Sequence, residues 1–170
     1  MIEPRRLLLD IFLDALRAVD GRTRVRDFLS GHSFNAPVYL LALGKAACAM
    51  ARGAHDVLGP AIGGALIVTK EGHSEPLPWP VREAGHPLPD SRSLDAGEAL
   101  KSFVASLPVD AHVLVLLSGG ASALVECLPA GMDLAQLQRI HTWLIGSGLD
   151  IRQINHVRKR LSLIKGGRLA

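Results

Sequence analysis

AHVLVLLSGGASAL, residues 111–124, is the stretch of sequence that decides the fold. Residues 113–117 form a continuous apolar run, which is typical of a strand buried on both faces of a parallel sheet. The turn Ser118-Gly119-Gly120 ends that run abruptly, and residues 121–127 then have the pattern of a helix. The turn is either an anion site, because glycines let backbone N–H groups approach a ligand, or a tight connection that needs glycine only for its geometry.

Strand and helix patterns alternate along the rest of the chain, which predicts parallel βαβ units. Further apolar runs predict strands at residues 38–43, 65–69 and 81–84. Apolar residues at helical spacing predict helices at residues 4–19, 45–58, 90–107, 134–145 and 150–164. The predicted fold is therefore α/β, Rossmann-like and doubly wound, with a mostly parallel sheet flanked by helices.

Two segments at the N-terminal end complete this prediction. The helix at residues 4–19 is expected to cover one face of the sheet. Residues 20–35 are polar and contain Gly21 and Gly31, so they are predicted to form a loop.

At the other end of the chain, the strand-helix pattern stops at Ala170 with no polar tail. We therefore expect residues 1–170 to be one α/β domain, the truncated N-terminal domain of a longer two-domain enzyme.

Composition excludes several classes of protein. The chain has 170 residues, of which 48% are hydrophobic and 4% aromatic, as expected for one ordered domain with an aliphatic core. Its net charge of +3 suits acidic small molecules, and it lacks an aromatic-basic motif for nucleic acid. No apolar run has the length of a membrane-spanning helix. We therefore expect neither nucleic acid nor membrane as a partner.

The N-terminal segment and the cysteines indicate the compartment. Residues 7–16 are apolar-rich, but Asp10 and Asp14 interrupt them and no small-residue cleavage site follows, which argues against a signal peptide. Cys48 and Cys127 both lie in apolar helical contexts and are interpreted as reduced packing residues. We therefore expect a cytoplasmic protein.

Lys45 is the first candidate functional residue. It follows the strand 38–43 directly and lies where the next helix is expected to begin. Ligands bind at this edge of a parallel sheet, and a lysine at a helix N-terminus is unfavourable unless an anion is shared there. The alternative is a solvated surface lysine. The segment is not a phosphate-binding P-loop, because the upstream glycine and the following Ser or Thr are missing.

Histidines and a polar helix stripe supply the other candidates. His73 follows the strand 65–69, and His86 lies in a constrained turn at residues 85–90; each is a possible general acid or base, or simply a solvent-facing side chain. Asn155, Arg158, Lys159 and Ser162 share one face of the helix predicted at residues 150–164. That stripe suits a phosphate or carboxylate, or it is an ordinary solvated helix face.

Five motifs in order resemble a known family. They are Leu43-Gly44-Lys45-Ala46-Ala47, Lys70-Glu71-Gly72-His73, Gly85-His86-Pro87-Leu88-Pro89-Asp90, residues 117–124 and residues 154–167. Each motif is weak by itself, but the ordered set is specific. Together they resemble the N-terminal domain of class II glycerate 2-kinases, which carry a C-terminal MOFRL domain. The resemblance extends from about Leu7 onward.

The resemblance implies a function and a set of site residues. It implies a kinase that transfers the γ-phosphate of ATP to the 2-hydroxyl of D-glycerate with a divalent cation, usually Mg²⁺. Lys45 maps to the family's catalytic lysine, and Ser118, Gly119, Gly120 and Ser122 map to the cleft where phosphates are expected. Ala121 replaces a glycine that is common in the family. An essential arginine of the family lies in a second domain, so this chain alone is expected to be inactive or nearly so.

The sequence leaves several points open. Asn155, Arg158 and Lys159 are assigned to the carboxylate of glycerate or to a phosphate. The general base is His73, His86 or a residue of the missing domain, and the sequence indicates no metal ligands. A half-built cleft leaves apolar surface for a second domain or a second copy, so a homo-oligomer is possible. The alternatives are a hydroxypyruvate reductase, for which no dinucleotide fingerprint is present, and a non-catalytic binding domain if 170 residues is the natural length.

Overall fold

The computed structural model describes residues 3–169. Its centre is a four-stranded sheet in the order β3-β2-β1-β4, in which every neighbouring pair of strands is parallel. The strands are β1 (Val38–Leu43), β2 (Ile62–Lys70), β3 (Val81–Ala84) and β4 (His112–Leu117). The helices are α1 (Pro4–Ala18), α2 (Gly21–Leu29), α3 (Ala47–Leu58), α4 (Ser91–Ala105), α5 (Ala121–Leu124), α6 (Leu134–Gly146) and α7 (Ile151–Arg160), with a 3₁₀ turn at Gly59–Ala61. The predicted α/β fold is confirmed, and the sheet is entirely parallel.

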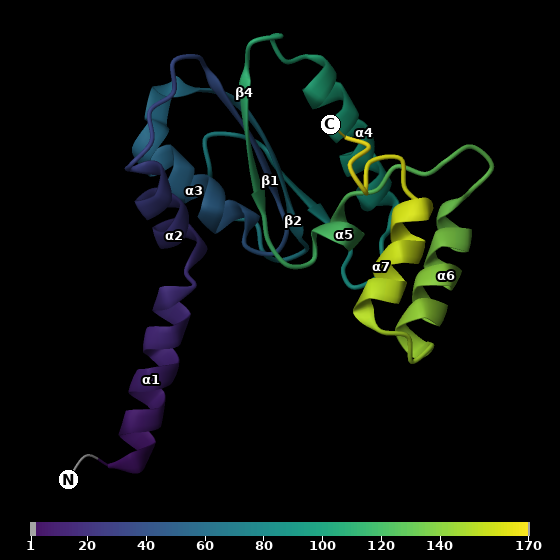
Figure 1. Ribbon diagram of the computed structural model, residues 1–170, viewed down its shortest axis with the longest axis horizontal. Coiled ribbons are helices and arrows are strands. Elements are labelled where there is room, and N and C mark those ends of the chain that lie inside the picture. The colour runs from purple at the N-terminus through teal and green to yellow at the C-terminus, as the bar shows by residue number, and fades with distance from the viewer. Residues whose placement is uncertain (1–2, 170) are drawn as a thin grey trace.

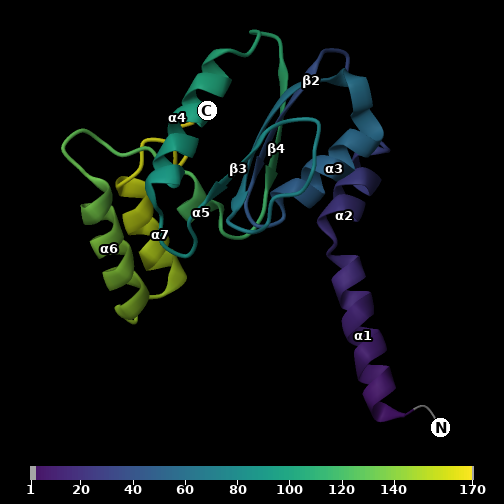
Figure 2. The ribbon, with the colours of Figure 1, turned by 180° about the vertical axis from the view of Figure 1, so that it is seen from behind.

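Helices cover both faces of the sheet (Figure 1). Helix α3, with α2 packed against it, buries one face through a small-residue surface that includes Ala47, Ala51 and Ala54. Helix α4 packs on the opposite face, where Leu100 joins Leu41 and Val68. Seen from behind, α6 and α7 form a pair beside α5, at the far side of the molecule from α1 (Figure 2). The doubly wound arrangement therefore follows from apolar strands that present side chains to both faces.

Strand β4 is less buried than its sequence predicts. It lies at an edge of the sheet, and Val113, Val115 and Leu117 are 42%, 49% and 63% exposed. Leu114 and Leu116 pack on the α3 side, so strand alternation turns the three exposed side chains to the α4 side. The prediction that residues 113–117 are buried on both faces is therefore wrong, because no helix in residues 3–169 covers this part of the α4 side.

Two further predictions, for the segments that form helices α1 and α2, are wrong. Helix α1 has no buried residue and projects away from the sheet, so it does not cover a sheet face as expected (Figure 1). Residues 21–29, predicted as loop, form helix α2. Its N-terminus is capped by the Asp20 side chain, which accepts a hydrogen bond of 2.8 Å from the Thr23 N–H. Its Leu29 is buried in the core. Tertiary packing and a cap outweigh the low apolar content of α2.

Three helix boundaries also differ from the predictions. Helix α3 begins at Ala47, so Lys45 lies in the turn before the helix. Helix α5 ends at Leu124 because Val125 is already extended. Helix α7 ends at Arg160, and residues 161–169 form turns.

No helix within residues 3–169 is long and apolar enough to cross a membrane.

Gly97 permits the close approach of α4 to the segment after α5. A Cβ atom built at Gly97 would lie 2.0 Å from the Glu126 carbonyl oxygen and 2.7 Å from the Cys127 Sγ. We expect Gly97→Ala to lower the free energy of unfolding by about 1–3 kcal/mol through overpacking, despite the better helix propensity of alanine. Urea unfolding measures the effect. Gly146→Ala is the matched control, since nothing lies within 4 Å of its Cβ position; equal losses in both variants would contradict this reading.

Candidate functional site

The carboxyl ends of all four strands lie at one edge of the sheet, and the predicted site residues follow them. The strands end at Leu43, Lys70, Ala84 and Leu117. Because the strands are parallel, the loops that follow them converge at that edge, where ligands bind in open α/β sheets. This brings the Lys45, His73, His86 and Ser118-Gly119-Gly120 segments to the same end of the molecule.

The turns after β1 and β4 are joined by hydrogen bonds. The Lys45 N–H donates to the Gly119 carbonyl at 2.9 Å, and the Ser118 N–H donates to the Leu43 carbonyl at 2.9 Å. The Ser118 Oγ accepts a 3.0 Å bond from the Ala46 N–H. Gly44 has φ +120°, and a Cβ there would lie 2.3 Å from the Ser118 Oγ. Ser118 and Gly44 therefore hold the two turns together, and this contact fixes the backbone position of Lys45.

Lys45 and His86 both lie against the Gly119-Gly120 turn. A Cβ at Gly120, which has φ +94°, would lie 3.0 Å from the His86 Cδ2 and 3.3 Å from the Lys45 Cγ. A Cβ at Gly119 would lie 3.8 Å from the Lys45 Cε. The lysine stem thus runs along the glycine turn. Helix α5 has only four residues, so positive charge at this edge comes from side chains rather than from a helix dipole.

His86 is half-buried and surrounded by positive charge. Burial lowers the pKa of its imidazole, and the charges of Lys45, Lys70 and His73 lower that pKa further. The ring is therefore neutral at pH 7, the form that accepts a proton. His73 is exposed, and its backbone N–H donates to the Lys70 carbonyl at 3.0 Å.

A cavity of about 330 Å³ lies on the α4 side of the sheet, next to the open face of β4. Its apolar wall includes Leu41, Leu43, Leu100, Val115 and Leu117. Its polar wall comes from α5, α7 and the turn after α7, through Ser122, Asn155, Arg158, Lys159 and Lys165. The structure therefore divides the predicted residues into a strand-end group and a cavity group. Lys165 is the residue that the polar stripe of α7 did not indicate.

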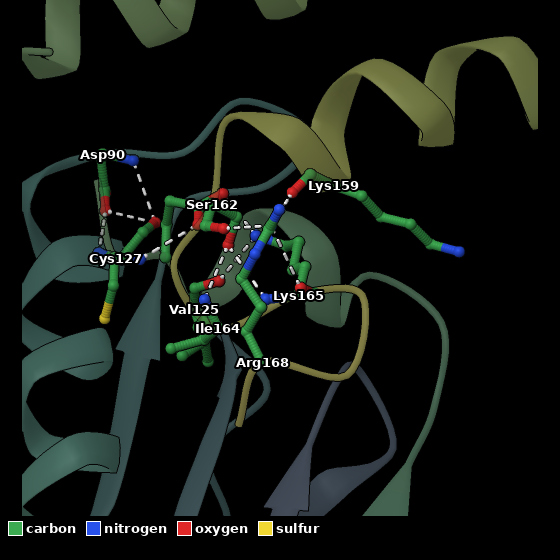
Figure 3. A network of polar contacts seen from close by, with 10 residues as sticks. Asp90, Val125, Cys127, Lys159, Ser162, Ile164, Lys165 and Arg168 are labelled. Carbon is green, nitrogen blue, oxygen red and sulfur yellow. Dashed lines mark hydrogen bonds and ion pairs between the residues drawn. The ribbon is translucent and has the colours of Figure 1, made fainter. Parts of the chain in front are cut away.

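A buried ion pair between Lys165 and Glu126 anchors the cavity wall, and Figure 3 shows the polar contacts around Lys165. The Lys165 ammonium contacts the Glu126 carboxylate and donates to the Val125 carbonyl at 3.2 Å. The Glu126 and Lys165 side chains are 2% and 17% exposed. Burial lowers the pKa of Lys165, and Glu126 opposes that effect. Arg168 donates to the Lys159 and Ser162 carbonyls, so the turn after α7 is closed on itself. The ion pair between Lys165 and Glu126 therefore ties the turn after α7 to the segment after α5.

His141 of α6 is 1% exposed, and the cavity residues Arg158 and Lys165 are near enough to act on its pKa. Within residues 3–169, neither of its ring nitrogens has a hydrogen-bond partner. Burial lowers its pKa to about 4, and the charges of Arg158 and Lys165 act in the same direction. The folded protein therefore holds this imidazole neutral.

The pKa of His141 predicts a loss of stability in acid. The unfolded chain binds a proton at this histidine below about pH 6.5, whereas the folded chain binds it only near pH 4. Stability from this group is complete above pH 6.5 and falls as pH decreases toward 4, by about 3 kcal/mol in all. We expect His141→Leu to remove that part of the pH dependence in urea unfolding measured between pH 7 and 4. His156→Leu, at an exposed position of α7, should leave it in place.

The carboxylates at the strand ends are already engaged. Arg92 binds Glu71 at 2.9 Å and Asp90 at 2.7 Å, and the Glu83 carboxylate accepts the Ser74 N–H at 3.1 Å. No group of three His, Cys, Asp or Glu side chains that could hold a metal occurs in the described part of the chain.

The fold and this edge define a class of protein: an α/β domain whose strand-end loops bring a lysine, a histidine and a glycine turn together at one edge of a parallel sheet. The chain belongs to the DUF4147 family, described as a domain of unknown function, whose model matches residues 7–170. It corresponds to the N-terminal domain of the glycerate 2-kinases that carry a MOFRL domain, so the resemblance found in the motifs is confirmed.

Relatives described as glycerate 2-kinases support this placement. The chain is 39% identical over 168 residues to D-glycerate 2-kinase of Thermotoga maritima, covering 98% of this chain and 40% of the relative. It is 43% identical over 163 residues to glycerate 2-kinase of Pyrococcus horikoshii, covering 92% and 37%. The crystal structure of glycerate kinase from Thermotoga maritima superposes with a TM-score of 0.87 over 96% of this chain and 40% of that one. The chain thus spans about two fifths of the length of these relatives.

Proposed function

We propose that this chain supplies the phosphate-binding part of a kinase that transfers the γ-phosphate of ATP to the 2-hydroxyl of D-glycerate. One observation carries the proposal: Lys45 lies along the Gly119-Gly120 turn at the carboxyl edge of the sheet, in a chain 39% identical to a D-glycerate 2-kinase. Phosphoryl transfer depends on positioning and on neutralising charge on the phosphate oxygens, which an exposed lysine beside a glycine turn supplies.

The remaining residues take complementary roles in this proposal. In the reaction the 2-hydroxyl oxygen of glycerate bonds to the γ-phosphorus, the bond from that phosphorus to ADP breaks, and the hydroxyl proton is transferred to a base. His86 is the proposed base because its lowered pKa keeps it neutral. His73 is a second candidate for that role. Arg158 and Lys159, with Asn155 and Ser122 beside them in the cavity wall, would hold the glycerate carboxylate or a phosphate.

A second domain belongs to this proposal. The relatives are more than twice as long as this chain, which covers 40% of the Thermotoga maritima enzyme. The exposed face of β4 and the unburied helix α1 are apolar surfaces that a second domain, or a second copy of the chain, would cover. We place the reaction in the cytoplasm, where buried free thiols such as Cys48 and Cys127 stay reduced.

The test is a coupled assay of ADP release with ATP, D-glycerate and Mg²⁺. It compares the 170-residue chain with a chimera in which residues 1–170 are followed by the remaining part of the Thermotoga maritima relative. We expect D-glycerate-dependent ADP release from the chimera and at most a trace from the chain alone. Binding of neither ATP nor D-glycerate by the chain, with no ADP release by the chimera, would favour a non-catalytic binding domain.

A reductase is the second candidate, because two relatives in Agrobacterium vitis are described as putative hydroxypyruvate reductases, one of them 39% identical over 132 residues. A Rossmann dinucleotide site needs a G-x-G-x-x-G turn after the first strand. The turn after β1 is Gly44-Lys45-Ala46-Ala47, and the turn after β4 is Ser118-Gly119-Gly120. The kinase is therefore preferred. Oxidation of NADH by the chimera with hydroxypyruvate would reverse that preference.

A further inference from the structure

Lys70 lies at the same sheet edge as Lys45, on the neighbouring strand. It is the last residue of β2, which lies between β3 and β1 in the sheet. Leu66 and Val68 of β2 face the α4 side, and strand alternation places Lys70 on that side too. Helix α5, which begins directly after Gly120, packs against β2 and β3. Lys70 therefore ends its strand next to the segment that carries the glycine turn.

His86 links the two outer strands across this edge. It follows β3 at one border of the sheet, yet it lies against Gly120, which follows β4 at the other border. The ends of β2 and β1, with Lys70 and Lys45, lie between them. The pKa of His86 is lowered by burial and then by the positive charges of Lys45, Lys70 and His73. These side chains therefore share one electrostatic environment.

The positive charge at this edge is offset by the protein only in part, through the longer-range attraction between Lys70 and Glu71. In the part of the chain that the structure describes, neither Lys45 nor Lys70 makes an ion pair. The nearby acids Glu71 and Asp90 are both bound by Arg92. Two unpaired ammonium groups on adjacent strand ends repel each other and attract an anion with more than one charged group. A chain of phosphates has that form.

We propose that Lys70 is a second anion-binding residue of this site, and that Lys45 and Lys70 together hold adjacent phosphates of one polyphosphate chain. The proposal deepens the kinase function and rests on it for the identity of the natural ligand as a nucleoside triphosphate. The sheet holds the backbones of the two residues side by side, since Leu43 is paired with Val68 and the Gly44 N–H donates to the Val68 carbonyl at 3.0 Å, so both lysine stems start from neighbouring points before the ligand binds. A monophosphate or a carboxylate engages only one of them fully.

Isothermal titration of the 170-residue chain with inorganic tripolyphosphate at low ionic strength tests the proposal. We expect Lys70→Gln and Lys45→Gln each to weaken binding by about tenfold or more, the loss of one charge-assisted contact. Lys70→Arg, which retains the charge, should bind within about threefold of the parent. Lys101→Gln, whose lysine pairs with Glu98 on the exposed face of α4, is the matched control and should change binding by less than about twofold.

Two further readouts separate a charge effect from a structural one. Binding by Lys70→Gln should depend less steeply on salt than binding by the parent, because one charged contact is gone. Inorganic phosphate should bind more weakly than tripolyphosphate, and the difference should shrink in Lys70→Gln. The proposal is overturned if the parent does not bind tripolyphosphate, or if Lys70→Gln binds like the Lys101→Gln control.

These outcomes are independent of the kinase test. Tripolyphosphate binding that needs Lys70, in a protein whose chimera releases no ADP with D-glycerate, keeps the anion site and removes the kinase function. ADP release by the chimera, with tripolyphosphate binding unaffected by Lys70→Gln, keeps the kinase and removes the role of Lys70.

Discussion

Lys45→Ala in the chimera with the Thermotoga maritima remainder is expected to reduce D-glycerate-dependent ADP release by at least about a hundredfold. The reason is that the lysine is the charged group that lies along the Gly119-Gly120 turn, which is the position that we propose for the transferred phosphate. Loss of one donor to such a phosphate typically costs 10²–10³ in kcat, or about 3–4 kcal/mol. Initial rates at several ATP and D-glycerate concentrations measure the effect and separate kcat from KM.

The control for this prediction must also be a lysine and must keep the fold. Lys101→Ala on α4 removes an exposed lysine paired only with Glu98, and we expect near-parental rates. Both variants should unfold at the same urea concentration as the parent, because Lys45 is exposed and makes no side-chain hydrogen bond among residues 3–169. A Lys45→Ala chimera that retains the parental rate would remove this lysine from the mechanism.

Glu126→Ala is expected to destabilise the chain by about 3–5 kcal/mol, a large share of the stability of a domain of this size. The carboxylate is 2% exposed, and it accepts from the Lys165 ammonium and, at 3.0 Å, from the Cys127 N–H. Its removal leaves the Lys165 ammonium, 17% exposed, without a counterion. Urea unfolding at pH 7 measures the loss.

A double variant shows whether charge is the cause. Replacing both partners, Glu126→Leu with Lys165→Met, leaves no uncompensated charge, so we expect it to be more stable than Glu126→Ala alone. Equal destabilisation of the single and double variants would mean that the Cys127 N–H contact and side-chain volume, rather than the ion pair, hold this segment in place.

The sequence was sufficient for the strands and the sheet but not for every helix. Apolar runs at residues 38–43 and 113–117 are unambiguous, because parallel strands must be apolar on both faces. The same property hides exposure: nothing in the run 113–117 indicates that β4 lies at an edge with Leu117 63% exposed. Helix α2 was missed because its residues are mostly polar, although Asp20 three positions before Thr23 was an N-cap signal.

The candidate site was predictable from the sequence for those residues that directly follow a predicted strand. Lys45 and Ser118-Gly119-Gly120 follow strands directly, so their shared edge is a consequence of parallel topology. The contact of His86 with Gly120 depends on segments from opposite borders of the sheet, and no local pattern encodes it. Lys70 is the last residue of β2, and Lys45 follows the end of β1 by two residues. The position of Lys70 at a strand end was therefore a sequence signal for the same edge. The pairing of Lys165 with Glu126 is set by tertiary packing and lay beyond sequence periodicity.

The ion pair also sets an order of events during synthesis of the chain. Glu126 leaves the ribosome 39 residues before Lys165, at a time when all four strands have already been made. Until the ribosome has released residue 165, burying the Glu126 carboxylate would leave it without a counterion. We therefore expect the sheet to pack with α3 and α4 first, and the segment after α5 to be buried only once Lys165 is available. The turn at residues 161–169 supplies Lys165 to the cavity wall and to the buried Glu126 carboxylate, so we expect this wall to become ordered late in the folding of residues 3–169.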